Sequence, residues 1–166
     1  LFSASALRAS YVRRVSSAII ANYPNHSLIV ITGRDKDLHK QIQNDAMWSA
    51  PHSYLIGWTQ NMPELIKASD IVITKAGGST VMECIAAKKP LVINKIIPGQ
   101  EEGNAELVER YKLGHIARKS SEIVTALNEI YKDYDSYTDR LTALSKPEAA
   151  RSIIEFLARR LEHKKS

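Results

Sequence analysis

Short apolar runs alternate along the chain with amphipathic stretches. Continuous runs rich in Val, Ile and Leu predict strands buried on both faces of a parallel sheet, and apolar residues at three- and four-residue spacing predict helices. This alternation predicts an α/β fold, a Rossmann-like parallel sheet flanked by helices. Strands are expected at residues 27–32, 53–56, 70–74, 90–94 and 115–117, and helices at about 3–22, 35–44, 63–68, 77–87, 104–112, 121–132, 136–144 and 147–162.

The chain opens at Leu1 and, in this interpretation, enters its first helix at Ser3 or Ser5 with no strand before it. A serine hydroxyl at either position suits a helix N-cap. The 166 residues are one domain's worth of chain. Because natural proteins begin with Met, we expect residues 1–166 to be a single-domain fragment that lacks its first strand.

Composition narrows the classes of function. There are 23 Lys and Arg against 18 Asp and Glu, a net charge of +5, which is too mild and too scattered for a nucleic-acid binder. The single cysteine, Cys84, excludes a disulfide framework and a multi-cysteine zinc site, and we expect it to fill the core. No apolar run approaches the ~20 residues of a membrane span, so we expect a cytoplasmic protein, at most peripheral at a membrane. The histidines lack metal-ligand spacing, so no metal site is expected; they are His26, His39, His52, His115 and His163.

The most unusual motif follows the predicted strand at 70–74. Gly77 and Gly78 would let backbone N–H groups approach a ligand, and the next helix N-terminus with the hydroxyls of Ser79 and Thr80 would complete a phosphate cradle. The alternative is a tight turn that uses the glycines for backbone geometry. The spacing matches neither a P-loop nor the dinucleotide fingerprint.

Glu83 lies three residues after Thr80 and has two interpretations. The spacing is that of a capping box, in which Glu83 closes the helix N-terminus. Alternatively, its carboxylate accepts hydrogen bonds from a ribose diol beside the bound phosphates.

The loop Pro98–Asn104 follows the predicted strand at 90–94. It crowds amide and carboxylate groups together, which suits a ligand rich in hydroxyl groups. Asn104 is equally suited to be the N-cap of the next helix, and the whole loop could be merely solvated. The position after a strand favours a functional role.

The third segment, Gly57–Met62, follows the predicted strand at 53–56. Trp58 and Met62 could form a flat apolar wall for a base, whereas Trp58 could equally cover the rim of the core. Gly33–Arg34, after the strand at 27–32, could approach the ligand or contribute only surface charge.

Taken in order, these motifs resemble the C-terminal half of family 28 glycosyltransferases, which include monogalactosyldiacylglycerol synthases, processive diacylglycerol glucosyltransferases and MurG. The resemblance covers residues 27–117. It implies a GT-B architecture, in which two Rossmann-like domains flank a cleft. The C-terminal domain holds the UDP-sugar, and the N-terminal domain holds the acceptor and the catalytic base.

By resemblance, the donor site has four parts. The diphosphate loop is Gly77, Gly78, Ser79 and Thr80; the ribose carboxylate is Glu83; the sugar-facing loop supplies Gln100, Glu101 and Asn104; and the uracil turn is Gly57, Trp58 and Thr59 with Met62 beside it.

The resemblance implies the UDP-sugar-binding domain of an inverting, metal-independent hexosyltransferase acting on a lipid or other hydroxyl acceptor at the cytosolic membrane face, with the UDP-sugar as substrate and no cofactor. The family's opening strand and glycine loop are not visible ahead of Ser3, and no catalytic base is identified. His115, which follows Gly114, is the candidate for a substitute base. The chain alone is expected to be inactive without an acceptor domain or partner chain. A non-hydrolysing UDP-sugar epimerase and a non-catalytic nucleotide-binding subunit are the alternatives.

Overall fold

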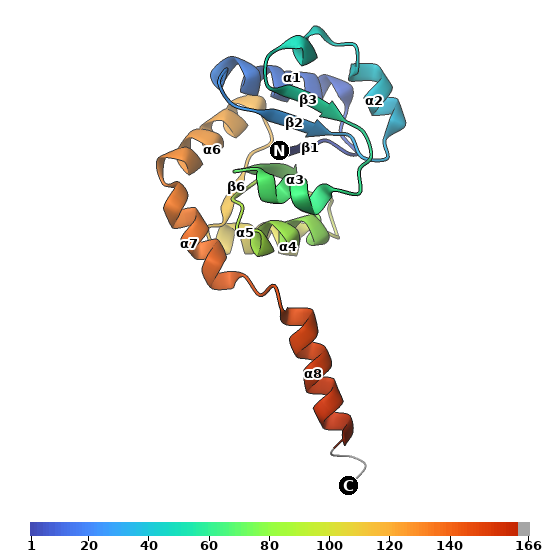
Figure 1. The fold of residues 1–166 in the computed structure, drawn as a ribbon. Coiled ribbons are helices and arrows are strands. Elements are labelled where there is room, and N and C mark those ends of the chain that lie inside the picture. The colour runs from blue at the N-terminus through green and yellow to red at the C-terminus, as the bar shows by residue number, and fades with distance from the viewer. Residues whose placement is uncertain (163–166) are drawn as a thin grey trace.

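A parallel sheet forms the centre of the molecule in the computed structural model, which describes residues 1–162 (Figure 1). Within these residues six strands pair in the order β3-β2-β1-β4-β5-β6, all parallel. This is the strand order of a doubly wound Rossmann fold, so the predicted fold class is confirmed. The strands are β1 (Phe2–Ser3), β2 (Leu28–Ile31), β3 (Ser53–Ile56), β4 (Val72–Lys75), β5 (Leu91–Lys95) and β6 (Gly114–Ile116).

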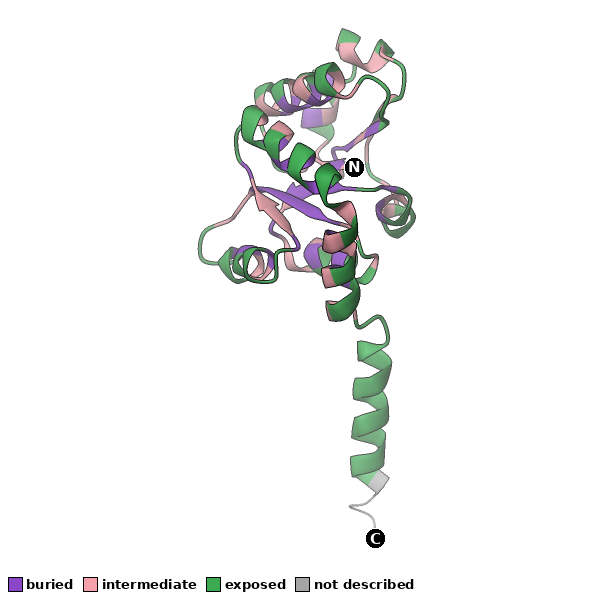
Figure 2. Ribbon diagram, turned by 90° about the vertical axis from the view of Figure 1, so that its left-hand side faces the viewer, coloured by how far each residue is buried: buried purple, intermediate pink, exposed green. Residues whose placement is uncertain are grey.

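Helices cover both faces of this sheet, and its inner strands are accordingly the most buried part of the molecule (Figure 2). One core cluster joins the sheet to α1, α2 and α6, and the other joins it to α3, α4 and α5. The helices are α1 (Ala9–Asn22), α2 (Lys36–Ile42), α3 (Met62–Ala68), α4 (Gly78–Ala86), α5 (Glu102–Arg110), α6 (Ser120–Lys132), α7 (Tyr134–Leu144) and α8 (Ala149–Glu162), with a short 3-10 turn η1 (Ala46–Ser49).

The start of the chain differs from the prediction. Phe2–Ser3 is a strand at the centre of the sheet, and α1 begins at Ala9 rather than at Ser3 or Ser5. Phe2 is fully buried and pairs with Val30 on one side and Ile73 on the other. Two residues carry no recognisable period, so only pairing on both sides defines this strand.

Helix α8 projects away from the sheet and its covering helices (Figures 1 and 2). Its side chains are exposed from Ala149 to Leu161, including those of Ile153, Ile154 and Phe156. No helix within residues 1–162 is both long and apolar enough to cross a membrane.

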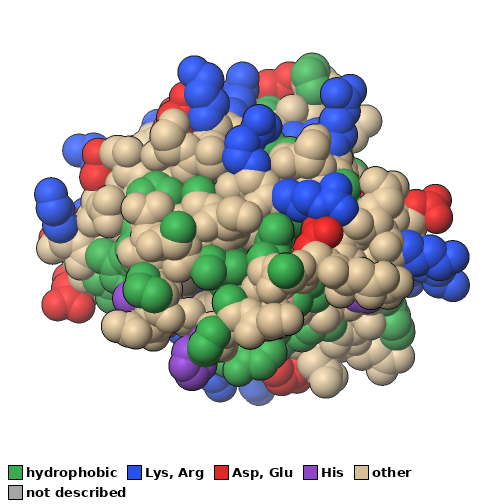
Figure 3. Space-filling view, turned by 90° about the horizontal axis from the view of Figure 1, so that it is seen from above, with side chains coloured by type: hydrophobic (Ala, Val, Ile, Leu, Met, Phe, Trp, Pro, Cys, Tyr) green, Lys and Arg blue, Asp and Glu red, His purple; other side chains and the backbone are tan. Residues whose placement is uncertain are grey.

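Positive charge is dispersed on the face seen from above Figure 1. Lys and Arg side chains lie across the upper part of this face and at its sides, and hydrophobic and uncharged groups occupy most of the lower middle (Figure 3).

Candidate functional site

The switch in strand order lies between β1 and β4. From β1 the chain builds outward to β2 and β3, and from β4 it builds outward to β5 and β6. Open α/β sheets bind ligands in the crevice at the carboxyl ends of the strands beside such a switch. The loops that enter this crevice are Ala4–Arg8 after β1, the turn at Ala76–Gly77 after β4, and residues 96–101 after β5.

The turn after β4 leaves a helix N-terminus open. Gly77 is the N-cap of α4, and no side chain accepts a hydrogen bond from the first turn of the helix. The first N–H groups of α4 are therefore free to bind an anion, with the partial positive charge of the helix behind them. Ser79 is exposed and Thr80 half-buried on this same turn.

Gly77 and Gly78 provide space rather than an unusual backbone. Gly77 has a φ of −67°, and neither glycine is among the described residues with positive φ. The interpretation that the glycines serve turn geometry is therefore wrong. A Cβ at position 77 would lie 2.8 Å from Lys75 Nζ, and one at position 78 would lie 3.4 Å from Asn104 Nδ2.

A hollow of about 300 Å³ lies against this turn. The two motifs that the sequence placed after separate strands meet in it. The described residues that line it are Lys75, Gly77, Gly78, Ser79, Thr80, Gln100, Glu101 and Asn104.

Glu101 and Asn104 hold this hollow together. Glu101 is 5% exposed; its Oε1 pairs with Lys75 Nζ, and its Oε2 accepts a hydrogen bond from Ile97 N at 3.0 Å. Asn104 Nδ2 donates to Ala76 O at 2.9 Å. Both side chains line the hollow, but Glu101 has its two oxygens engaged within the protein. Gln100, in contrast, is exposed and free to meet a ligand.

Two capping interpretations are wrong. Helix α4 begins at Gly78, so Thr80 and Glu83 lie inside it and form no capping box. Asn104 lies in the first turn of α5, whose N-cap is Glu101. Glu83 is exposed on α4, outside the residues that line the hollow. Its carboxylate is therefore open to solvent.

The segment Gly57–Met62 lies apart from this hollow. Gly57 and Trp58 line a second hollow of about 630 Å³ with Gly33 and Arg34. Trp58 is 54% exposed, so it does not cover the core, and the Arg34 guanidinium lies 5.9 Å from the centre of its ring.

Thr59 and Met62 line neither of these two hollows. The Oγ1 of Thr59 accepts a hydrogen bond from Asn61 N at 3.0 Å, and Met62 packs partly buried against the core. Of the predicted uracil turn, only Gly57 and Trp58 line either hollow among the described residues.

Sequence reasoning missed Lys75 as a site residue. It ends β4 directly before the glycine turn, and its ammonium group lies beside that turn. The available signal was a cation two residues ahead of Gly77, at the carboxyl end of a buried strand.

His115 is not placed to act as a base at this site. Its Nε2 lies 2.6 Å from the hydroxyl of Tyr137 on α7 and 3.4 Å from Glu129 Oε2 on α6. It lines neither hollow described above. Cys84 is buried, and burial raises the pKa of its thiol to about 12, as suits a residue that fills the core. His163 lies outside the described residues.

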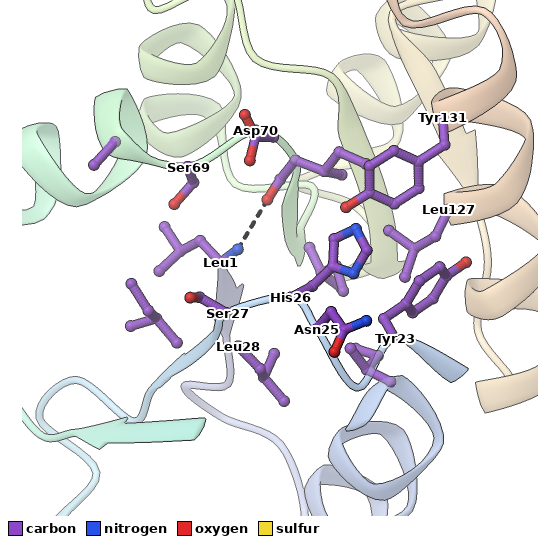
Figure 4. A pocket seen from close by; sticks show the side chains of 15 residues that line it. Leu1, Tyr23, Asn25, His26, Ser27, Leu28, Ser69, Asp70, Leu127 and Tyr131 are labelled. Atoms are coloured by element: carbon purple, nitrogen blue, oxygen red, sulfur yellow. Dashed lines mark hydrogen bonds between the residues drawn. The ribbon is translucent and has the colours of Figure 1, made fainter. Parts of the chain in front are cut away.

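A further hollow of about 360 Å³ opens at the other end of the strands, where β1, β2 and β4 begin (Figure 4). Its lining includes Leu1, Leu28 and Asp70, which lie at or before the beginnings of β1, β2 and β4. Tyr23 and Tyr131 close one side, with ring centres 5.7 Å apart. Because it lies at the amino ends of the strands, this hollow is separate from the switch-point crevice.

Two curated relatives resemble the chain in sequence. Processive diacylglycerol beta-glucosyltransferase of Staphylococcus carnosus is 30% identical over 117 residues, covering 70% of this chain and 30% of the relative. Monogalactosyldiacylglycerol synthase 2 of Arabidopsis thaliana is 29% identical over 136 residues, covering 80% of this chain and 29% of the relative. The chain thus spans less than a third of the length of each relative.

Solved structures share the fold. MurG of Acinetobacter baumannii superposes with a TM-score of 0.69 at 15% identity, covering 96% of this chain and 48% of MurG. UDP-GlcNAc 2-epimerase of Neisseria meningitidis, bound to UDP-GlcNAc, gives 0.68 at 16% identity, covering 95% of this chain and 43% of the epimerase. At these identities the likeness shows the fold alone.

The family assignment comes from the sequence. The profile of the glycosyltransferase family 28 C-terminal domain matches residues 5–157, which include the glycine turn, the Pro98–Asn104 loop and all the described strands except β1. The resemblance drawn from the motifs is therefore confirmed, and the chain belongs to the glycosyltransferase family 28 C-terminal domain family.

Proposed function

We propose that this chain is the UDP-sugar-binding domain of an inverting hexosyltransferase. The observation that carries the proposal is the uncapped N-terminus of α4 behind Gly77 and Gly78, which opens onto a hollow shared with the amide-bearing loop after β5. The epimerase bound to UDP-GlcNAc has the same fold, and the family is one of glycosyltransferases, which supports a nucleotide-sugar ligand.

The reaction would be a direct displacement at the anomeric carbon. An acceptor hydroxyl oxygen forms the new bond to that carbon as the bond to UDP breaks, and the hydroxyl proton passes to a general base. The N–H groups at the start of α4 would stabilise the negative charge that grows on the departing diphosphate. Gln100 and Asn104 would contact the sugar hydroxyls, Glu83 the ribose, and Trp58 the uracil ring.

The donor site described above does not include a binding site for the acceptor. General-base catalysis requires a group within about one hydrogen bond of the acceptor hydroxyl. We assign no residue of this chain to that role, and propose that a further domain or partner chain supplies it. The diacylglycerol named for the relatives favours a lipid acceptor, met at the cytosolic face of a membrane. The isolated chain should accordingly bind donor without turnover.

Calorimetric titration with UDP, UMP and uridine tests the donor site. UDP should bind more tightly than UMP, because only its second phosphate completes the contact with the α4 N-terminus. Glu83→Ala should weaken UDP binding by roughly 1–3 kcal/mol, the scale of a hydrogen bond to a charged group. Glu109→Ala, which removes an exposed carboxylate at the far end of α5, serves as the control.

Two results would count against the proposal. Absence of UDP binding by the folded wild-type chain would remove the donor-site assignment, and equal affinity in Glu83→Ala would remove the ribose role of Glu83. Interconversion of UDP-GlcNAc and its 2-epimer by this chain would instead favour the epimerase alternative.

A further inference from the structure

We infer that Lys75 is a further donor-binding residue, whose ammonium group binds the sugar-bearing phosphate and is positioned for that contact by Glu101. The inference rests on the proposed function, because it assigns one more contact in the same donor site. It adds a side-chain cation to a phosphate cradle that is otherwise built from backbone N–H groups and hydroxyls.

Lys75 lies directly beside the glycine turn. It is the last residue of β4, at the switch point of the sheet, and its side chain is 33% exposed. Its Nζ lies where a Cβ on Gly77 would come within 2.8 Å. The ammonium group therefore stands over the turn whose N–H groups face the hollow.

The charges that line the hollow leave a bound diphosphate only partly balanced. Among the described residues that line the hollow, Lys75 and Glu101 are the charged ones. Their charges cancel, so the side chains lining the hollow carry almost no net charge, and the helix terminus adds a partial positive charge. A diphosphate adds negative charge that a helix N-terminus only partly offsets, since the helix dipole amounts to roughly half a charge. Lys75 is the cation within the hollow that can balance the rest.

The ammonium group of Lys75 has hydrogen-bond donors to spare. An ammonium group has three N–H donors, and Lys75 gives one to Glu101. The remaining donors can reach a phosphate oxygen without breaking that ion pair. Glu101 is itself fixed, because it is buried and accepts from Ile97 N. It therefore holds a flexible lysine stem in one orientation before the ligand arrives.

A purely structural role is the competing interpretation. The ion pair joins residues 26 positions apart and thereby fastens the β5–α5 loop to the end of β4. A fastening role and a binding role predict different results for the two partners. If Lys75 only fastens the loop, removing either charge has the same consequence.

The experiment compares UDP and UMP affinities by calorimetry for the full chain and three variants. Lys75→Gln should lower UDP affinity about ten- to hundredfold, the scale of one lost charge-assisted hydrogen bond, with a much smaller change for UMP. Glu101→Gln should reduce the preference for UDP over UMP less than Lys75→Gln does, because the ammonium group remains but is less firmly oriented. Lys95→Gln is the matched control, since Lys95 ends the neighbouring strand and donates to Ala6 O at 2.7 Å instead.

Urea denaturation of each variant measures whether it is folded, so that only the affinities of folded proteins are compared. An unchanged preference for UDP in folded Lys75→Gln would overturn the inference while leaving the proposed function intact. Equal loss of UDP preference in Lys75→Gln and Glu101→Gln would also overturn it, in favour of fastening. If Lys75→Gln does not fold, Lys75→Met takes its place: a reduced preference for UDP supports the inference, and an unchanged preference overturns it. Wild-type protein that binds no UDP overturns the proposed function itself.

Discussion

The turns after β1 and β4 lie side by side at the switch point, yet they are built in opposite ways. After β4, two glycines take ordinary negative φ values and leave space open. After β1, Ala6 takes a φ of 62°, a conformation that favours glycine, and its carbonyl accepts a hydrogen bond from Lys95. Glycine thus occurs where room is needed, and alanine occurs where the backbone is strained.

The difference shows which turn is shaped for a ligand. Both α1 and α4 begin without a side-chain cap, so each presents free N–H groups to the crevice. The β4 turn adds a hollow and two polar side chains from the next loop, Gln100 and Asn104. The β1 turn is instead braced from β5 through Lys95. We therefore assign the diphosphate to the β4 turn.

The largest expected effect comes from filling the β4 turn. In Gly78→Val the Cβ would already lie 3.4 Å from Asn104 Nδ2, so the added methyl groups must displace this side chain or enter the hollow. UDP affinity should fall about 100-fold, or roughly 2.7 kcal/mol, as measured by calorimetry. Wild-type affinity in the folded variant would mean that the space serves only internal packing.

A smaller effect is expected from relieving the β1 turn. Ala6→Gly removes a left-handed backbone cost of about 1–2 kcal/mol but adds freedom to the unfolded chain, which costs about 0.4–1 kcal/mol. The free energy of unfolding in urea should therefore rise by about 0.5 kcal/mol, with UDP affinity unchanged. A drop in stability would show that the brace from Lys95 already offsets the strain, and a drop in UDP affinity would bring this turn into the donor site.

The smallest expected effect is a local loss of stabilisation at Glu102 when the pH is lowered. Hydrogen bonds from backbone N–H groups, above all that of Gly99 at 2.6 Å, hold the pKa of Glu102 below its ordinary value. A lowered folded-state pKa means that this stabilisation is present above the ordinary pKa, about 4.5, and is lost as the pH falls through the folded value.

The amide signals in an NMR titration can locate this loss. The Gly99 signal should shift as the pH falls below about 4.5, whereas that of Ala6 in the β1 turn should not. Glu102→Gln should abolish the Gly99 shift. Simultaneous shifts at both positions would indicate a general loosening of the fold rather than a local change.

Much of the sheet could be predicted because its inner strands are buried on both faces. The run Leu28–Ile31 and residues 91–93 of β5 are continuously apolar. The edge strand β3, although only partly buried, also lies at the predicted residues. Strand β1 could not be found in this way, because two residues have no period. The 3-10 turn Ala46–Ser49 was also missed, since it carries no buried residue and so leaves no apolar pattern.

Site features formed by neighbouring residues could be predicted from the sequence, whereas features formed by contacts between distant segments could not. The sequence identified the glycine turn and the Pro98–Asn104 loop, because both follow buried strands. The resemblance placed Glu101 in the sugar-facing loop, but it could not show that its carboxylate is engaged by Lys75 from another strand. The sequence also offered caps at Glu83 and Asn104, because local spacing does not reveal where a helix begins.

The sequence by itself determined the parallel α/β sheet, the family and the two motifs of the donor site, since each is written in contiguous residues. The tertiary structure alone decided that Gly77 and Gly78 provide space, that Lys75 meets Glu101 over the turn, and that His115 is held by α6 and α7. The physical reason is the same in all three cases. Each property depends on atoms from separate segments of the chain, and only the packing of the sheet and its helices brings those atoms together.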